Sequence, residues 1–129
     1  MSEVPREFLY TEDHEWIKVE GDTGTVGITD HAQKALSDLT FVELPEIGKE
    51  VTRGEEACAV ESCKAAASIY APASGRIIEV NTALEDNPGL VNADCYGEGW
   101  IFKIQLADKT ELSELKSSEE YEQLLPDEE

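Results

Sequence analysis

Residues 57–75 of the chain read ACAVESCKAAASIYAPASG and carry only two charged side chains, Glu61 and Lys64. Elsewhere the chain is rich in charge, since 30% of all residues are charged. Alanine, serine and small apolar residues surround Lys64 on both sides. Small neighbours leave its amine accessible to another protein's active site, and they leave room for a long group attached to it. The stretch therefore indicates that Lys64 is an attachment point.

The flanking segments predict a hairpin with Lys64 at its tip. Upstream, small or apolar residues recur at every third position over residues 48–60, and downstream, residues 69–80 read IYAPASGRIIEV, a turn followed by a strand-like run. The tip lacks the Asn-Gly or Asp-Gly pair of a two-residue hairpin turn. A helical turn with a surface ion pair is the alternative, because Glu61 and Lys64 are three residues apart and the alanines at 65–67 have high helix propensity.

The sequence around the lysine resembles the lipoyl-attachment segment of the glycine cleavage system H protein family. Lys64 has Glu61 three residues before it and Gly75 eleven residues after it. The resemblance continues in the family's order over nearly the whole chain, at HEW (14–16), VGITDHAQ (26–33), FVELPEIG (41–48), NPGLVN (87–92) and GWIFKI (99–104).

The resemblance implies a mostly β fold of the lipoyl/biotinyl hammerhead type, a flattened barrel or sandwich of two antiparallel sheets. The residue pattern agrees, because it contains many short strand-like runs and few helical ones. The 129 residues, 40% of them hydrophobic, suffice for one core, so a single lipoyl-carrier domain is expected over residues 1–129. Its acidic end, near 126–129, is expected to be frayed.

A short helix is expected after a first hairpin formed by residues 15–19 and 24–28. Asp30 is the predicted N-cap, and Gln33 three residues later completes a capping-box pattern. The apolar positions predicted for one face of this helix are Ala32, Ala35, Leu36 and Leu39.

The second half of the chain is expected to end in a helix. Residues 81–91 contain Pro-Gly, which prevents a long regular element, and residues 100–105, WIFKIQ, are expected to form a closing strand of the core. Leu112 and Leu115 then fall on one helical turn. Ser117 and Glu120 form a second capping-box pattern before the final apolar residues.

Charge and cysteine content exclude several classes of function. The net charge of −19 argues against binding to nucleic acid or to an anionic membrane, because both would repel the chain. Three cysteines without metal-ligand spacing indicate neither a disulfide framework nor a zinc site, and a reducing compartment fits best. The N-terminal residues resemble neither a secretory leader nor a transit peptide, so the bacterial cytoplasm is the expected location.

The sequence predicts a carrier and not an enzyme. His14 and His31 lie in separate segments, and neither belongs to a motif that pairs it with a cysteine or serine nucleophile. His31, on the short helix, is most simply a surface residue. No phosphate-binding glycine loop is present in the sequence.

The family resemblance implies that Lys64 forms an amide with lipoic acid, which would change the net charge from −19 to −20. It also implies a shuttle for the aminomethyl group of glycine. The pyridoxal-phosphate-dependent glycine decarboxylase loads the arm, a tetrahydrofolate-dependent aminomethyltransferase unloads it, and dihydrolipoyl dehydrogenase, with FAD and NAD, reoxidises it. The alternative is an H-like protein that donates or carries lipoyl groups in another pathway.

The same resemblance assigns roles to four more residues. Glu61 and Gly75 match positions that lipoate-attaching enzymes read, although the turn before Gly75 could also require a positive φ there. Glu15 maps onto the acid of the cleft that shelters the arm; an ordinary exposed strand residue is the alternative. Ser68 stands where the family usually has an acid, so the second carboxylate of the cleft is either missing or replaced by a hydroxyl.

Another residue departs from the family pattern, and three other classes of protein are alternatives to this family. Cys63 is interpreted as a neutral replacement of the usual valine more readily than as a redox partner of the arm. A biotin carrier usually has its lysine between two methionines, and the only methionine here is Met1. A lipoyl domain of a 2-oxoacid dehydrogenase is usually followed by a linker and a catalytic domain. A purely structural acidic protein is the remaining rival, and an intact mass without a lipoyl increment would favour it.

Overall fold

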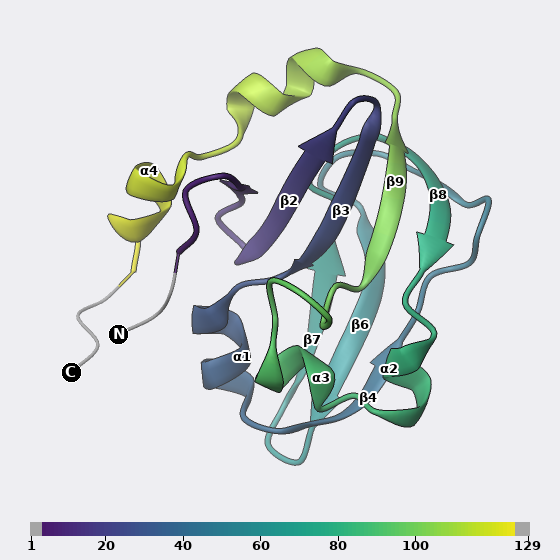
Figure 1. Cartoon of the computed structure of the whole chain (residues 1–129), viewed down its shortest axis with the longest axis vertical. Coiled ribbons are helices and arrows are strands. Elements are labelled where there is room, and N and C mark those ends of the chain that lie inside the picture. Colours follow the sequence, from purple (N-terminus) through teal and green to yellow (C-terminus); the bar gives the residue numbers. More distant parts are fainter. Residues whose placement is uncertain (1–3, 126–129) are drawn as a thin grey trace.

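The structure is a computed structural model that describes residues 4–125, so the expected frayed tail near 126–129 lies outside the described residues. Two antiparallel sheets dominate it (Figure 1). The six-stranded sheet has the order β1-β2-β3-β9-β8-β5 and the three-stranded sheet the order β4-β6-β7. The strands are β1 (Leu9–Tyr10), β2 (Glu15–Glu20), β3 (Thr23–Ile28), β4 (Leu39–Glu43), β5 (Glu50–Val51), β6 (Glu56–Ser62), β7 (Ala66–Tyr70), β8 (Gly75–Val80) and β9 (Phe102–Leu106).

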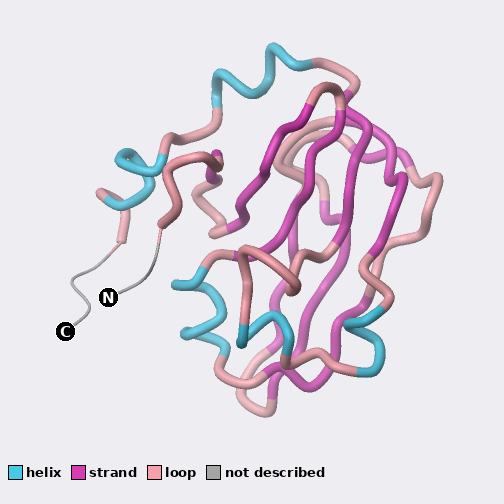
Figure 2. Tube along the Cα trace, viewed as in Figure 1, coloured by secondary structure: helices cyan, strands magenta, loops and turns pink. Residues whose placement is uncertain are grey.

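The smaller sheet lies behind the larger one in Figure 1, and the helices are short and peripheral (Figure 2). They are α1 (Asp30–Leu36), α2 (Ala83–Asp86), α3 (Leu90–Ala93), the 3₁₀ helix η1 (Lys109–Glu114) and α4 (Ser118–Glu122). The expected flattened sandwich with a helix after the first hairpin and a helix near the C-terminus is therefore confirmed. None of the helices within residues 4–125 is long and apolar enough to cross a membrane.

The core lies between the two sheets because each strand buries alternate side chains. In β9, Phe102 and Ile104 are fully buried while Gln105 between Ile104 and Leu106 is exposed. From the smaller sheet, Val60 and Ile69 point into the same core cluster. The outward positions of the smaller sheet are consequently left to polar and small residues, with one exception described below.

Two local predictions need correction. The N-cap of α1 is Thr29 and not Asp30: Thr29 has extended backbone angles, and its hydroxyl accepts the N–H of Ala32 at 3.3 Å. Gln33 instead bonds the Asp30 carboxylate at 2.7 Å. The predicted apolar face also extended too far, because Leu39 already belongs to β4.

The closing strand begins at Phe102 and not at residue 100. Trp100 takes part in a turn, since its N–H bonds the carbonyl of Gly97 at 3.1 Å. Asn81 holds this turn by donating its side-chain amide to the carbonyls of Glu98 and Trp100, at 2.8 and 2.7 Å. The second capping box is confirmed: the Ser117 hydroxyl and the Glu120 side chain each bond the other residue's backbone N–H.

Candidate functional site

Lys64 lies at the tip of the β6–β7 hairpin, as predicted, and the helical alternative is wrong. The last strand pair before the tip joins Glu61 to Ala66. Ser62 closes the turn: its backbone N–H bonds the carbonyl of Ala65 at 2.8 Å, and its hydroxyl accepts the N–H groups of Lys64 and Ala65 at 3.2 and 3.1 Å. A serine side chain thus supplies the turn that the absent Asn-Gly pair would otherwise provide.

The lysine side chain is exposed, and none of the ion pairs among residues 4–125 involves it. Glu61 is also exposed and lies on a strand, so the helical geometry required for the alternative ion pair does not exist. Cys63 is exposed beside the lysine, whereas Cys58 and Cys95 are buried. An exposed amine on a turn built from small residues can be reached by another protein's active site.

Gly75 lies far from this tip. It begins β8, near the top of Figure 1, whereas the hairpin tip is at the bottom. Its φ is not positive, so the predicted turn explanation is wrong. The actual reason for a glycine is close packing, because a Cβ atom would lie 2.1 Å from the Gln105 carbonyl oxygen of β9. Only Glu61 of the two predicted enzyme-recognition residues is near Lys64.

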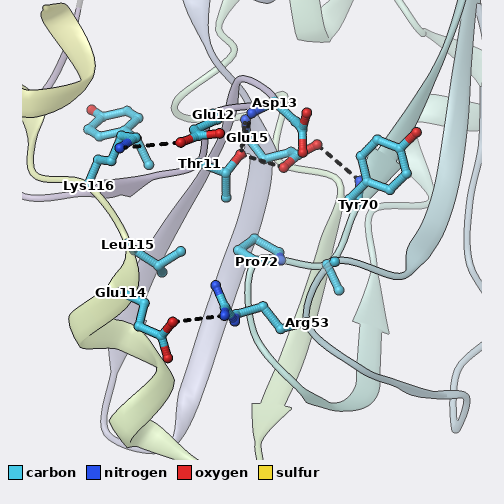
Figure 3. Close-up of a pocket in the computed structure, with 13 residues that line it drawn as sticks. Thr11, Glu12, Asp13, Glu15, Arg53, Tyr70, Pro72, Glu114, Leu115 and Lys116 are labelled. Carbon is cyan, nitrogen blue, oxygen red and sulfur yellow. Dashed lines mark hydrogen bonds and ion pairs between the residues drawn. The ribbon is translucent and has the colours of Figure 1, made fainter. Parts of the chain in front are cut away.

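Glu15 is buried, with 1% of its surface exposed, so the alternative of an exposed strand residue is wrong. It follows His14, whose φ of 71° turns the chain into β2. Its carboxylate accepts the hydroxyl of Thr11 at 2.6 Å and the backbone N–H of Tyr70, on β7, at 3.0 Å (Figure 3). This side chain therefore joins the start of the larger sheet to the end of the hairpin.

The pKa of Glu15 is raised to about 7, chiefly by burial; the bonds from Thr11 and Tyr70 oppose the rise, and the nearby Asp13 carboxylate adds to it. An open cleft of about 270 Å³ lies against this carboxyl group, lined by residues 10–13, 53–54, 70–72 and 114–116 together with Glu15 (Figure 3). Two ion pairs, Arg53 with Glu114 and Lys116 with Glu12, lie among the lining residues. The cleft can hold a cationic group near a buried acid.

Ser68 lies on the exposed face of β7, and its hydroxyl donates to the carboxylate of Glu56 at 2.8 Å. A carboxylate is therefore present beside residue 68, although it comes from β6. Glu56, Thr11 and Tyr70 are not among the site residues that the sequence predicts. Regular pairing outward from the hairpin tip does not place Glu56 opposite Tyr70, because a register shift between Glu56 and Cys58 brings it there. Nothing local indicates that Thr11 and Tyr70 hold Glu15.

The two histidines are close together despite their separation in sequence. Their ring centres are 4.8 Å apart, and His31 is half-buried, so it is more than a simple surface residue. His14 Nδ1 lies 2.7 Å from the hydroxyl of Tyr121 on α4, which is also 2.7 Å from the hydroxyl of Thr29. Burial and the neighbouring His31 lower the pKa of His14. Within residues 4–125, no group of three His, Cys, Asp or Glu side chains could hold a metal ion.

Comparison with known proteins covers almost the whole chain. Residues 8–128 match the family model described as glycine cleavage H-protein. The glycine cleavage system H protein of Photorhabdus laumondii is 55% identical over 130 residues, which is 100% of both chains. That of Escherichia coli is 54% identical over 99% of this chain and 100% of its own length.

A solved structure agrees with these matches. The crystal structure of a glycine cleavage system H protein from Mycobacterium marinum superposes with a TM-score of 0.83 at 45% sequence identity. The superposition covers 91% of this chain and 94% of the other. The likeness therefore extends over both sheets and is not limited to the segment around Lys64.

Proposed function

Because the chain belongs to the glycine cleavage H-protein family, we propose that it is the lipoyl-bearing carrier of the glycine cleavage system. In this proposal, residues 1–129 act as one carrier domain, and lipoic acid is joined by an amide to Lys64. The observation that carries the proposal is the position of this lysine, exposed at the tip of a hairpin and outside every ion pair of residues 4–125. A Lys64 side chain inside a helix and out of reach of another enzyme would have contradicted the proposal.

The residues around Lys64 suit such a group. Ser62 fixes the backbone of the turn, and Ala65 and Ala66 next to it leave no bulky side chain that would restrict an attached arm. When bound, lipoic acid supplies a dithiolane whose sulfur atoms accept a one-carbon group and electrons. The chain itself contributes position and shelter, since tethering raises the local concentration of a group to the order of mM at a docked enzyme.

We assign Glu15 to the shelter of the carried aminomethyl group. The ammonium of that group would find a carboxylate that is largely withdrawn from water, in a cleft next to β7. Tyr70 lies six residues from Lys64, roughly 20 Å along an extended strand, so the carried group reaches Glu15 only when the arm lies back along β7. The Glu56–Ser68 pair lies on the hairpin between these two positions and would provide a second carboxylate.

The proposed partners act in sequence. Glycine decarboxylase loads the carrier, aminomethyltransferase unloads it, dihydrolipoyl dehydrogenase reoxidises it, and a lipoate-attaching enzyme modifies it beforehand. Cys58 and Cys95 are buried, Cys63 is exposed in the turn beside Lys64, and His14 contacts Tyr121 and His31. In this proposal the partner enzymes supply the catalysis and the chain carries the group between them.

The test is the Lys64→Arg variant. With a lipoate-attaching enzyme, lipoate and ATP, the parent protein gains one lipoyl increment in intact mass and the variant gains none, because arginine cannot form this amide. Lys49→Arg, at another exposed lysine, is the control and is expected to be modified normally. Both variants should unfold at the parent's temperature, because exposed substitutions usually change stability by no more than about 0.5 kcal/mol.

The second part of the test is reconstitution of glycine oxidation from the lipoylated protein and the three partner enzymes. Turnover of glycine with the parent and none with Lys64→Arg supports the proposal. A lipoylated parent that supports no turnover would assign the chain to another pathway. A parent that gains no lipoyl group on Lys64 would remove the proposal altogether.

A further inference from the structure

The outward side chains of the three-stranded sheet form a surface directly beside Lys64. Two cross-strand rows make it up, and residues opposite one another in antiparallel strands point to the same face. We call this surface the outer sheet face; its six residues are Phe41, Glu61 and Ala66 in the first row and Glu43, Ala59 and Ser68 in the second. The first row adjoins the hairpin tip.

Phe41 is the exception to the polar and small composition of this face, and 51% of its surface is exposed. Its inward neighbour Val42 is buried and Glu43 is exposed, so β4 alternates from Phe41 onward. The irregularity in β4 lies just before it, because the pairing with β6 shifts register between Leu39 and Phe41 and Thr40 is also exposed. The residue opposite it in β6 is Glu61, and the next residue across the sheet is Ala66, which is too small to cover an aromatic ring. The ring therefore remains available to another molecule.

The charge of the outer sheet face has one sign. Strands β4, β6 and β7 contain three carboxylates, those of Glu43, Glu56 and Glu61, and no lysine or arginine. A protein that covers this face needs an apolar depression for the ring, bordered by basic side chains. Aromatic residues in such a setting commonly contribute most of the binding free energy, and the surrounding charges steer association.

The position of the face selects one class of partner. An enzyme that acylates Lys64 must bring its active site to the amine itself, within one side chain of the backbone. Glu61, in the first row, is three residues from Lys64, roughly 10 Å along the strand, so an enzyme that encloses the hairpin tip also covers this row. Enzymes that act on the far end of a flexible arm have no such requirement.

Resting on the proposed function, we propose that the outer sheet face is the docking surface of the lipoate-attaching enzyme, with the Phe41 ring in an apolar depression and Glu43 and Glu61 beside basic side chains of that enzyme. In the reaction it positions, the amine of Lys64 attacks the carbonyl of lipoyl adenylate. The amide C–N bond forms, the C–O bond to AMP breaks, AMP leaves, and the amine releases a proton to solvent.

The experiment compares Phe41→Ser with Ile47→Ser. Ile47 is 64% exposed and lies outside the three strands, so it controls for loss of any exposed apolar residue. Purified lipoate-protein ligase, lipoate and ATP are used, and the rate of lipoylation is followed by intact mass at several concentrations of the unmodified protein. Phe41→Ser is expected to lower kcat/KM roughly tenfold, mainly by raising KM, while Ile47→Ser remains within about twofold of the parent.

Phe41→Leu, which keeps an apolar side chain and is the more conservative change, should recover part of the loss and also serves if the serine variant folds poorly. Fully lipoylated Phe41→Ser should be reduced by dihydrolipoyl dehydrogenase at the parent's rate. Equal kcat/KM for the parent and both Phe41 variants overturns the inference, as does an equal loss in Ile47→Ser or in the dehydrogenase reaction. These results leave the proposed function intact, because that function fails only if the parent protein itself is not lipoylated on Lys64 or if the lipoylated parent supports no glycine turnover.

Discussion

Glu15 is a carboxyl group with two hydrogen-bond donors and almost no contact with water. Two bonds from Thr11 and Tyr70 favour the ionised form, but removal from water favours the neutral form more strongly, and the pKa rises to about 7. Near neutral pH this side chain is therefore close to half ionised. Its charge, which the proposed pairing with an ammonium requires, increases as the pH rises through this value.

Ionisation of Glu15 should lower stability. Because the folded pKa is about 7 and the ordinary value is 4.5, the folded state binds more protons than the unfolded state between these two pH values. The free energy of unfolding should then fall as the pH rises through this window, by an amount on the order of 3 kcal/mol. Glu15→Gln should remove this slope, as measured by urea unfolding at about pH 5 and about pH 8.

The contribution of His14 to the pH dependence of stability must be distinguished from that of Glu15. Its lowered pKa means that the folded state binds fewer protons than the unfolded state, so its contribution falls as the pH drops below 6.5. The two slopes have opposite signs, and Glu15→Gln should leave only the histidine slope. An unchanged pH profile in Glu15→Gln would contradict the assignment. The same variant should lose the carried aminomethyl group to water faster than the parent, most clearly above the pKa of Glu15.

At the scale of elements, the β6–β7 hairpin was predictable because its evidence is local. The small residues around Lys64 and the strand-like runs beside them lie within one stretch of sequence. The burial of Glu15 was not predictable, because its partner Tyr70 is 55 residues away. The pairing of Glu56 with Ser68 depends on a register shift between Glu56 and Cys58, which no pattern in the sequence marks.

The contact between β8 and β9 explains Gly75 better than local turn chemistry. Gly75→Ala should destabilise the protein by roughly 1–3 kcal/mol, because the added methyl group would lie against the Gln105 carbonyl and the two strands would have to separate. Thermal or urea unfolding measures the loss. The variant should still be lipoylated on Lys64 under conditions where it is folded, if the main role of the glycine is strand packing.

Gly89→Ala is the matched control. Gly89 has a φ of −64°, and a Cβ atom there would lie no closer than 3.4 Å to a neighbouring atom, so alanine fits without strain. Its unfolding temperature should equal or exceed that of the parent. Equal stability of Gly75→Ala and the parent would show that β8 and β9 can move apart at little cost. Loss of lipoylation in a stably folded Gly75→Ala variant would indicate instead that the lipoate-attaching enzyme recognises Gly75.

At the scale of the whole molecule, the net charge of −19 over 129 residues should affect stability. Mutual repulsion of the carboxylates opposes the compact state. Raising the ionic strength from about 10 mM to about 150 mM shortens the screening length from about 30 to about 8 Å, so the unfolding temperature should rise. Calorimetry in sodium chloride measures this change directly.

Sodium sulfate at equal ionic strength separates screening from salting-out. Similar increases in Tm in both salts indicate screening of the net charge, whereas a much larger increase in sulfate indicates strengthened burial of apolar surface. No increase in chloride would mean that the excess negative charge is too widely spread over the surface to affect folding. Lipoylation removes one positive charge and should make the chloride effect slightly larger.

The absence of lysine and arginine from β6 and β7 has a practical consequence for proteomics. Lys64 is the only cleavage point for trypsin between Arg53 and Arg76, so a digest of the free-amine protein yields two peptides from this region, 54–64 and 65–76. An acylated lysine is not cut, and the same digest then yields one peptide, 54–76. The ratio of these products reports the fraction of molecules that carry the group in a cell extract.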